Sequence, residues 1–410
     1  MKAKLKHKVE GYATSIISVL NSAGYEAYIV GGAIRDLLLN RIPKDYDIST
    51  NATPEEIRSL FGRKKARIIG RRFKIVHIYI ADQVVEVSTF RTRPKKPSDN
   101  RLQKKYNTPK NLIFRDNEYG TVDEDASRRD FTVNALYYDP IKDSIHDFTG
   151  HGLDDISSGV VRSIGNPKIR FEEDPVRILR ALKLVAQYDF KLTDETYDAL
   201  KQSLKLLKHV TPARLSLEFE KVMLSQYCTK ILTTLKEYDL LKFFLPYINS
   251  EWKSSARKRS FELLDIYKAR VKEGKYRNSI SISLATMILP FVEDKLGFND
   301  PGTLWEPDHT ASVQIKKTLF TTIMPHTFCK HITMACIKMV ELQPLLTQGY
   351  SSELLNRRNI FHAIELLNIL NLYYWHNDEI TSIWENHRRK THKNKKRRPR
   401  RRKKKPTETK

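Results

Sequence analysis

Short apolar runs alternate with segments of helical spacing over roughly the first 150 residues of the chain. Apolar residues recur at helical spacing near 9–22, and the run AYIV at 27–30 is typical of a buried strand. The pair Gly31-Gly32 then opens AIRDLLL, which predicts a turn followed by a helix, and a further strand is expected around 46–50. This alternation predicts a region that mixes helices and strands.

The same region carries clear boundary signals. The sequence Thr-Pro-Glu-Glu at 53–56 places a cap residue, a proline and two acids at the start of a helix. The segments FKIVHIYI at 73–80 and QVVEVSTFR at 83–91 both predict strands. Only residues 81–82 separate them, so the two strands are expected to form a β-hairpin.

Beyond about residue 150 the pattern changes to long segments with apolar residues at helical spacing and few strand signals. The clearest of these segments lie at 176–190, 213–224 and 360–375. We therefore expect this part to be all-helical. The predicted fold class is α+β, with a small mixed sheet in the head and helices in the remainder.

The formal net charge of +25 points to a polyanionic partner, either nucleic acid or an anionic surface. Fifteen Lys and Arg residues and one Glu from residue 388 onward supply +14 of this charge. The segment 388–410 lacks large aliphatic residues, so we expect it to be disordered alone. It is interpreted as an RNA-binding arm that includes Arg400, Arg401 and Arg402, although a solubilising tail would have the same composition.

The chain lacks the features of a membrane or secreted protein. No run of about 18 apolar residues is present, so no membrane partner is expected. Glu10, Thr14 and Ser15 interrupt the apolar core that a signal peptide needs. The cysteines show neither zinc spacing nor a disulfide framework, so we expect all of them to be buried and the chain to be cytoplasmic. They are Cys228, Cys329 and Cys336.

Two carboxylates, Asp45 and Asp47, stand two residues apart at the expected strand, and such residues point to one face. Like charges held that close repel unless a cation lies between them. Mg²⁺ prefers oxygen ligands and leaves positions open for substrate phosphates. Such a pair alone is usually a solvated surface feature, but here it follows a glycine turn and a helix. We predict a metal at Asp45 and Asp47, and anion binding by Gly31, Gly32 and Arg35.

A third carboxylate is expected to complete a two-metal site. Glu86 lies between valines in VVEVSTF, where an acid in mid-strand calls for a partner, although a solvated strand face is the alternative. Asp123 belongs to an acidic run just before Arg128-Arg129, which could equally be a surface ion-pair loop. Both residues remain candidates, Glu86 as a metal ligand and Asp123 as a catalytic carboxylate.

The segments GGAIRDLLL and KDYDIST resemble the polymerase-β-like nucleotidyltransferase superfamily, in particular the bacterial branch that holds CCA-adding enzymes and poly(A) polymerases. RRDFTVNALYYDP at 128–140 is similar to the ribose and phosphate motif of that branch. GNPKIRFEEDPVRILRALK at 165–183 is similar to its base-reading helix. The motifs cover about 28–190, nearly half of the chain, and their joint order is highly specific.

The resemblance implies that Asp45 and Asp47 bind two Mg²⁺ ions, while an RNA 3′-hydroxyl attacks the α-phosphate of ATP and pyrophosphate leaves. Asp174 and Arg177 would share a helix face and read the base edge, although their spacing alone favours an intrahelical salt bridge. The residues implied to bind the nucleotide are Gly31, Gly32, Arg35, Arg129, Asp130, Asn134, Asp174, Arg177 and Arg180.

The resemblance also implies a domain order. The nucleotidyltransferase head would span 1–150, a helical neck that reads the base 151–215, a helical RNA-binding body 216–387, and the basic tail 388–410. The segment IIGRRFKIVHI at 68–78 is similar to the signature that separates bacterial poly(A) polymerases from CCA-adding enzymes. There Arg71 and Arg72 would contact RNA, and Phe73 and His77 fit the pattern.

Three functions follow from these patterns. The favoured one is a poly(A) polymerase that uses ATP and Mg²⁺ to extend RNA 3′ ends. A tRNA CCA-adding enzyme would share nearly every catalytic residue and would differ by adding both C and A. An RNA-binding protein with an inactive head is the third, and the intact pair Asp45 and Asp47 argues against it.

Overall fold

The chain consists of two compact units, Met1–Thr211 and Pro212–Lys410, and each is described by itself. The predicted RNA contacts Arg71, Arg72 and Arg400 to Arg402 lie outside the described residues. The computed structural model describes residues 5, 7–70, 74–80, 82–92, 118–297, 304, 306, 308–322, 328–349, 351, 353–384 and 386.

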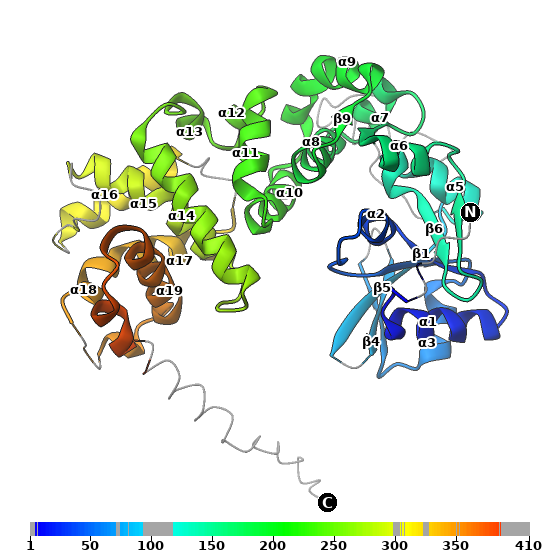
Figure 1. Ribbon diagram of the computed structural model, residues 1–410, viewed down its shortest axis with the longest axis horizontal. Helices are drawn as coiled ribbons and strands as arrows, with labels where there is room; N and C mark the ends of the chain where they lie inside the picture. Colours follow the sequence, from blue (N-terminus) through cyan, green and yellow to red (C-terminus); the bar gives the residue numbers. More distant parts are fainter. Residues whose placement is uncertain are drawn as a thin grey trace, which may run out of the picture. The chain divides into compact units, whose positions relative to one another are not determined.

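A seven-stranded mixed sheet forms the centre of the first unit, in the order β3-β4-β5-β2-β1-β6-β7 (Figure 1). Strands β2 and β5 run parallel, and every other neighbouring pair runs antiparallel. This confirms the predicted mixed sheet, and the antiparallel pairing of β4 with β5 confirms the predicted hairpin. The strands are β1 Ala27–Val30, β2 Asp47–Thr50, β3 Ala66–Ile69, β4 Ile75–Ile80, β5 Gln83–Thr89, β6 Leu136–Asp139 and β7 Ser144–Asp147.

Short helices surround this sheet at the positions that the sequence predicts. At the start of α3, Thr53 accepts a hydrogen bond from the backbone N–H of Glu56, whose side chain in turn accepts from the Thr53 backbone. This reciprocal cap and the proline at the first helical position confirm the predicted helix start. The helices are α1 Gly11–Ser22, α2 Gly32–Leu38, α3 Pro54–Phe61, α5 Val122–Arg128, the 3-10 turn η1 Thr132–Asn134, and α6 Gly152–Ser158.

The rest of the first unit is helical with one exception. Two short parallel strands, β8 Val160–Val161 and β9 Lys191–Leu192, pair with each other. The expectation of an all-helical region beyond residue 150 is therefore wrong at this point, because two-residue strands leave no periodic signal. The helices are α7 Pro167–Glu173, α8 Val176–Tyr188, α9 Asp194–Ser203 and the 3-10 helix η2 Leu204–His209.

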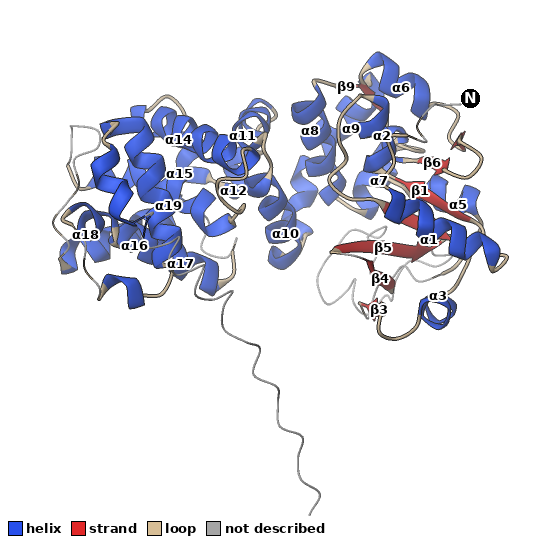
Figure 2. Cartoon of the chain, turned by 60° about the horizontal axis from the view of Figure 1, so that its bottom comes forward, coloured by secondary structure: helices blue, strands red, loops and turns tan. Residues whose placement is uncertain are grey.

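The second unit is built on the buried helix α15, Ile280–Lys295 (Figure 2). All twelve residues at 282–293 are buried, and α10, α14, α16, α17 and α19 pack around the helix. The other helices are α10 Pro212–Leu224, α11 Cys228–Glu237, α12 Leu241–Phe244, α13 Pro246–Ser250, α14 Ser255–Lys272, α16 His309–Thr322, α17 Lys330–Glu341, α18 Gln343–Thr347, η3 Leu354–Asn356, α19 Ile360–Leu370 and the π-helical turn η4 Asn371–Trp375.

The cysteines only partly match the expectation. Cys228 and Cys336 are buried free thiols, as predicted, but Cys329 is exposed, so the prediction of burial is wrong for this residue. Cys329 stands just before α17, and the two residues that follow it, Lys330 and His331, are exposed as well. In the described part of the chain, no helix has both the length and the hydropathy to cross a membrane.

A buried ion pair ties α14 to α19. Glu365 is fully buried and accepts two hydrogen bonds from the Arg270 guanidinium, at 2.6 Å from Nε and 2.9 Å from Nη2. Removing one partner of such a pair leaves a buried charge without compensation, which usually costs more than the pair itself contributes.

We expect Glu365→Ala to lower the free energy of unfolding by about 3–5 kcal/mol, because Arg270, whose side chain is only 13% exposed, loses its counter-charge. Urea denaturation followed by circular dichroism measures this change. The matched control is Glu273→Ala, which removes an exposed carboxylate that pairs with the nearby Lys275. Equal midpoints for the two variants would contradict the assignment.

A second buried carboxylate makes the stability of this unit depend on pH. Glu293 on α15 accepts a hydrogen bond from the Tyr374 hydroxyl at 3.1 Å, and Arg259 Nε lies 3.8 Å away. Burial raises the pKa of Glu293 to about 7, although the hydrogen bond from Tyr374 and the charge of Arg259 lower it. The folded state therefore holds this proton more tightly than the unfolded chain, in which the pKa of the carboxyl is 4.5.

The contribution of this proton to stability is complete below pH 4.5 and is lost as the pH rises to about 7. The loss amounts to at most roughly 3 kcal/mol. We expect Glu293→Gln to gain stability relative to the wild type across this interval and to keep a constant difference above it. Denaturation midpoints at several pH values measure the difference, and parallel curves for the two proteins would refute the prediction.

Candidate active site

The two predicted metal ligands lie at the amino end of β2. Asp47 is the first residue of the strand, and Asp45 lies just before it rather than on it. Both side chains are exposed, while Tyr46 between them is buried. The alternation of a strand therefore already holds at Asp45, and the two carboxylates face solvent on the same side.

Glu86 reaches the same place from the neighbouring strand. Because β2 and β5 are parallel with Ile48 opposite Val87, Glu86 lies beside Asp47. Asp47 keeps contact with solvent, but partial burial and the charges of Asp45 and Glu86 raise its pKa to about 6. Three carboxylates therefore repel one another here, and this is the cost that a divalent cation would offset.

The metal site is not complete by itself. Among the described residues, no three carboxylate, imidazole or thiol groups are close enough to enclose a metal ion. This arrangement suits Mg²⁺, which commonly takes one or two protein carboxylates together with water and substrate phosphates. The donor set of Asp45, Asp47 and Glu86 consists of hard oxygen ligands and fits that ion.

The other candidate, Asp123, lies on the exposed side of α5 and is not among the charges that shift the pKa of Asp47. The three residues of the acidic run have different environments: Asp123 faces solvent, Glu124 caps α5 through Thr121, and Asp125 points into the core. Asp125 was not among the site residues predicted from the sequence. Its burial could have been predicted from the helical spacing between Val122 and Ala126.

Asp125 holds the cation that faces the carboxylates. Its Oδ2 accepts hydrogen bonds from Arg129 Nη2 at 3.1 Å and from the Tyr137 hydroxyl at 2.6 Å. Burial would raise the pKa of Asp125, but the charges of Arg129 and Arg128 and the Tyr137 hydrogen bond lower it. Arg129 also donates to Ser49 Oγ on β2 at 3.2 Å, and its charge lowers the pKa of Asp47.

The glycine turn between β1 and α2 lies against two guanidinium groups. Gly31 has φ +76°, a backbone conformation that favours glycine. A Cβ atom at Gly31 would lie 3.5 Å from Arg129 Nη1, and one at Gly32 would lie 3.1 Å from Arg35 Nη2. The turn thus combines backbone without side chains and two nearby positive charges, which suits a phosphate.

Asn134 links the glycine turn to the acidic residue Asp130. Arg35 donates to Asn134 Oδ1 and, at 2.6 Å, to the Tyr188 hydroxyl. Asn134 Nδ2 donates to Asp130 Oδ1 at 3.1 Å, and Arg180 Nη1 lies 3.7 Å from Asp130 Oδ2. The predicted nucleotide-binding residues of the head and of α8 therefore form one connected network.

The charges of this network keep Asp130 ionised. Burial alone would raise the pKa of Asp130. The positive charge of Arg180, the Asn134 amide and the charge of Arg177 together outweigh burial and lower it.

Asp174 and Arg177, the predicted base-reading pair, do not have the arrangement that was predicted for them. Asp174 does not share a helix with Arg177, because α7 ends at Glu173 and α8 begins at Val176 after Pro175. The shared helix face predicted from their spacing is therefore wrong. Both side chains are buried at the junction of the two helices.

Arg177 is held in place at this junction. Its Nη1 atom donates to the Arg170 carbonyl at 2.7 Å and to Glu173 Oε2 at 3.0 Å. Arg170, which the sequence analysis missed, is 1% exposed and donates to the backbone carbonyls of Arg128 and Arg129. The α7–α8 junction is thereby attached to the Arg129-Asp130 motif.

His77 lies next to the third carboxylate. It stands opposite Glu86 on β4, and its Nε2 atom is 3.4 Å from Glu86 Oε1. The signature segment at 68–78 therefore reaches the carboxylates through His77, while its residues Arg71, Arg72 and Phe73 lie outside the described part of the chain.

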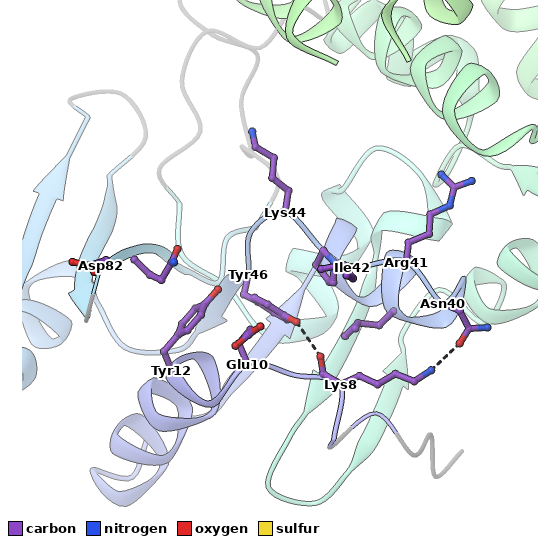
Figure 3. Close-up of a pocket in the computed structure, with 12 residues that line it drawn as sticks. Lys8, Glu10, Tyr12, Asn40, Arg41, Ile42, Lys44, Tyr46 and Asp82 are labelled. Carbon is purple, nitrogen blue, oxygen red and sulfur yellow. Dashed lines mark hydrogen bonds between the residues drawn. The ribbon is translucent and has the colours of Figure 1, made fainter. Parts of the chain in front are cut away.

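A cavity of about 790 Å³ lies beside this site (Figure 3). Tyr46 lines it, whereas Asp45 and Asp47 on either side of Tyr46 do not. Its wall is held together by hydrogen bonds from the Tyr46 hydroxyl to the Lys8 carbonyl at 3.2 Å and from Lys8 Nζ to Asn40 Oδ1 at 2.8 Å.

Two family models match the chain. Residues 27–162 match the poly A polymerase head domain, and residues 189–251 match the probable RNA and SrmB-binding site of polymerase A. Poly(A) polymerase I of Salmonella typhi is 40% identical over 236 residues, 58% of this chain and 50% of that protein. The CCA-adding enzyme of Geobacillus sp. (strain WCH70) is 37% identical over 256 residues, 62% of this chain and 59% of that protein.

The matched part spans about half the length of these curated relatives. Among solved structures, the Bacillus stearothermophilus CCA-adding enzyme in complex with CTP has a TM-score of 0.58 at 23% identity, covering 93% of this chain and 82% of that one. A tRNA nucleotidyltransferase with a primer tRNA and an ATP analog has a TM-score of 0.52 at 22% identity, covering 93% and 99%. These likenesses show the fold. Residues 27–162 therefore correspond to a poly A polymerase head domain, and the relatives that the chain resembles include poly(A) polymerases and CCA-adding enzymes.

Proposed function

We propose that this chain is a template-independent poly(A) polymerase that transfers AMP from ATP to RNA 3′ ends. The observation that carries the proposal is the group of Asp45 and Asp47 at the start of β2 and Glu86 in the middle of the parallel strand β5, near the cation of Arg129. The 40% identity to poly(A) polymerase I supports the choice of substrate.

In the proposed reaction the RNA 3′-oxygen forms a bond to the α-phosphorus of ATP. The bond from that phosphorus to the oxygen bridging to the β-phosphate breaks, and pyrophosphate leaves. Asp45, Asp47 and Glu86 would hold two Mg²⁺ ions, which supply charge stabilisation and a lower pKa for the hydroxyl. The proton of the 3′-hydroxyl passes to solvent water, which reaches the site because Asp45 and Asp47 are exposed.

The triphosphate would lie at the glycine turn. The backbone at Gly31 and Gly32 can approach a phosphate closely because no side chain intervenes, and Arg35 and Arg129 supply charge from behind the turn. Both guanidinium groups are fixed by hydrogen bonds, Arg35 to Asn134 and Arg129 to Asp125. Such fixed cations need little reorganisation when the leaving group develops charge.

Selection of adenine would rest on Asp174 and Arg177 at the α7–α8 junction, with Arg180 near the sugar. Because Glu173 and the Arg170 carbonyl hold Arg177, the junction presents one fixed pattern of donors and acceptors. A site that must hydrogen-bond one base rejects another by leaving buried polar groups unpaired. A fixed pattern suits the repeated addition of one nucleotide.

RNA and the cell compartment are part of the same proposal. The second unit and the basic segment 388–410 would bind RNA upstream of the 3′ end. The three free thiols fit a reducing cytoplasm.

A CCA-adding enzyme is the second candidate, and the 256-residue match at 37% identity favours it specifically. Such an enzyme must change its base recognition between C and A and stop after three additions. The two functions therefore differ in their products rather than in their catalytic residues.

The metal ligands are tested by removing one charge at a time. Asp45→Asn and Asp47→Asn should each reduce AMP incorporation by roughly a thousandfold or more, because the amide no longer binds Mg²⁺ against the phosphates. The melting temperature of Asp47→Asn should not fall, since one of three repelling charges is gone. Near-normal turnover of either variant at saturating Mg²⁺ would overturn the assignment.

The third ligand is tested by a matched pair of variants. Glu86→Gln should also lose most activity, whereas Asp123→Asn should stay close to the wild type, because Glu86 acts on Asp47 and Asp123 does not. The reverse order of activities would make Asp123 the third carboxylate.

Nucleotide choice separates the two enzymatic functions. With an unstructured RNA primer and one labelled nucleotide at a time, we expect repeated incorporation of ATP and poor incorporation of CTP. Gel analysis of the products measures both. If the protein instead adds two C residues and one A to a tRNA that lacks them, and then stops, it is a CCA-adding enzyme.

A further inference from the structure

A row of exposed cations lies in the second unit, outside the residues that either family model matches. Lys330, His331 and Lys338 come from α17, and Arg357 and Arg358 come from the turn between η3 and α19. Lys330 and Lys338 are eight residues apart, about 12 Å along the helix axis. The two elements pack against each other, which joins these side chains into one surface.

The cations line two adjacent cavities. The larger, of about 530 Å³, is lined by Lys330, His331, Lys338 and Arg358 around the apolar side chains of Met334 and Ala335. The smaller, of about 220 Å³, is lined by Lys338, Arg357 and Arg358. Because Lys338 and Arg358 line both, the cavities adjoin and form one groove, whose lining combines these cations with the apolar side chains of Met334 and Ala335.

The lining carries more cations than carboxylates, because the smaller cavity holds Glu341 together with Lys338, Arg357 and Arg358. Among the described residues, no ion pair involves Lys330, Lys338, Arg357 or Arg358. Glu341, a carboxylate of the lining, already accepts a hydrogen bond from Ser312 Oγ.

Two other basic residues of the same unit are paired: Arg270 is bound to Glu365, and Arg259 to Asp294. The cations of the groove differ from these because they gather in a hollow surface, where they attract a polyanion. The amide end of α19, which begins at Ile360 without a side-chain cap, adds a partial positive charge at the same place.

We propose that this groove between α17 and the start of α19 binds the phosphate backbone of single-stranded RNA, upstream of the 3′ end that reacts in the head. The inference rests on the proposed function for the identity of the polyanion. Cations spread over about 12 Å of α17 suit a chain of phosphates better than one phosphate group, and the apolar side chains of Met334 and Ala335 suit a base or ribose. The groove would retain the RNA between successive additions.

The test compares two double variants of equal charge change. K338Q/R358Q removes the two cations shared by both cavities, and K316Q/K317Q removes two exposed lysines of α16 that do not line the groove. Fluorescence anisotropy measures the affinity of the full-length protein for an unstructured RNA of about forty nucleotides and for a primer of about four.

K338Q/R358Q should weaken the long RNA roughly tenfold at moderate salt, while K316Q/K317Q should change it little. The slope of log K against log salt should fall by about 1.4, since each phosphate contact on a single strand contributes about 0.7. Binding of the short primer and of ATP should not change. Equal losses in both double variants, or an unchanged salt slope, would overturn the proposal.

Two further results separate an RNA-binding groove from a membrane-binding surface, and the groove from the enzymatic activity. Loss of binding to anionic phospholipid vesicles with unchanged RNA affinity would assign the groove to a membrane surface and refute the RNA site. A wild type that binds long RNA through the groove but incorporates no AMP would refute the proposed enzymatic function and leave the RNA site intact. Binding is measured without catalysis, so the two failures remain separable.

Discussion

The hydrogen bonds of Arg129 connect the parts of the candidate active site. Its guanidinium binds Asp125 on α5, Ser49 on β2 and the Tyr137 hydroxyl on β6, and its backbone carbonyl accepts from Arg170 on α7. A cation at this position counters the repulsion at Asp47 and lies beside the glycine turn. Moving it would therefore disturb the carboxylates, the turn and the base-reading junction together.

The arrangement of the carboxylates at the candidate site lowers the stability of the fold. Burial and the charges of Asp45 and Glu86 raise the pKa of Asp47. The charge of Arg129 offsets part of this effect. A divalent cation with substrate phosphates would offset the rest, so that repulsion among the carboxylates becomes affinity for metal.

The second unit treats buried and exposed charges differently. The buried Glu365 is paired with Arg270, and the buried Lys268 donates to the Met223 carbonyl and to Ser283 Oγ, because a lone charge in the core is costly. The groove cations such as Lys338 stay in water and need no partner. They remain available to a polyanion that the fold itself does not contain.

Local patterns in the sequence predicted the parts of the head that depend on neighbouring residues. The strand before Gly31, the capped helix at Thr53 and the β4–β5 hairpin all follow from spacing, caps and turns within a few positions. The shared side of Asp45 and Asp47 belongs to the same class, since the alternation of extended backbone at β2 already holds at Asp45, just before the strand.

Only the tertiary structure shows that Glu86, and not Asp123, lies beside Asp47. This placement depends on β5 running parallel beside β2, a pairing across 39 positions between Ile48 and Val87 that no local pattern encodes. The roles of Asp125 and Arg170 are likewise set by partners distant in sequence, Arg91 and the carbonyls of Arg128 and Arg129. The sequence by itself determined which chemical groups are present and how each segment folds locally. Tertiary structure decided which of those groups meet, because burial and charge act between residues that only the packed chain brings together.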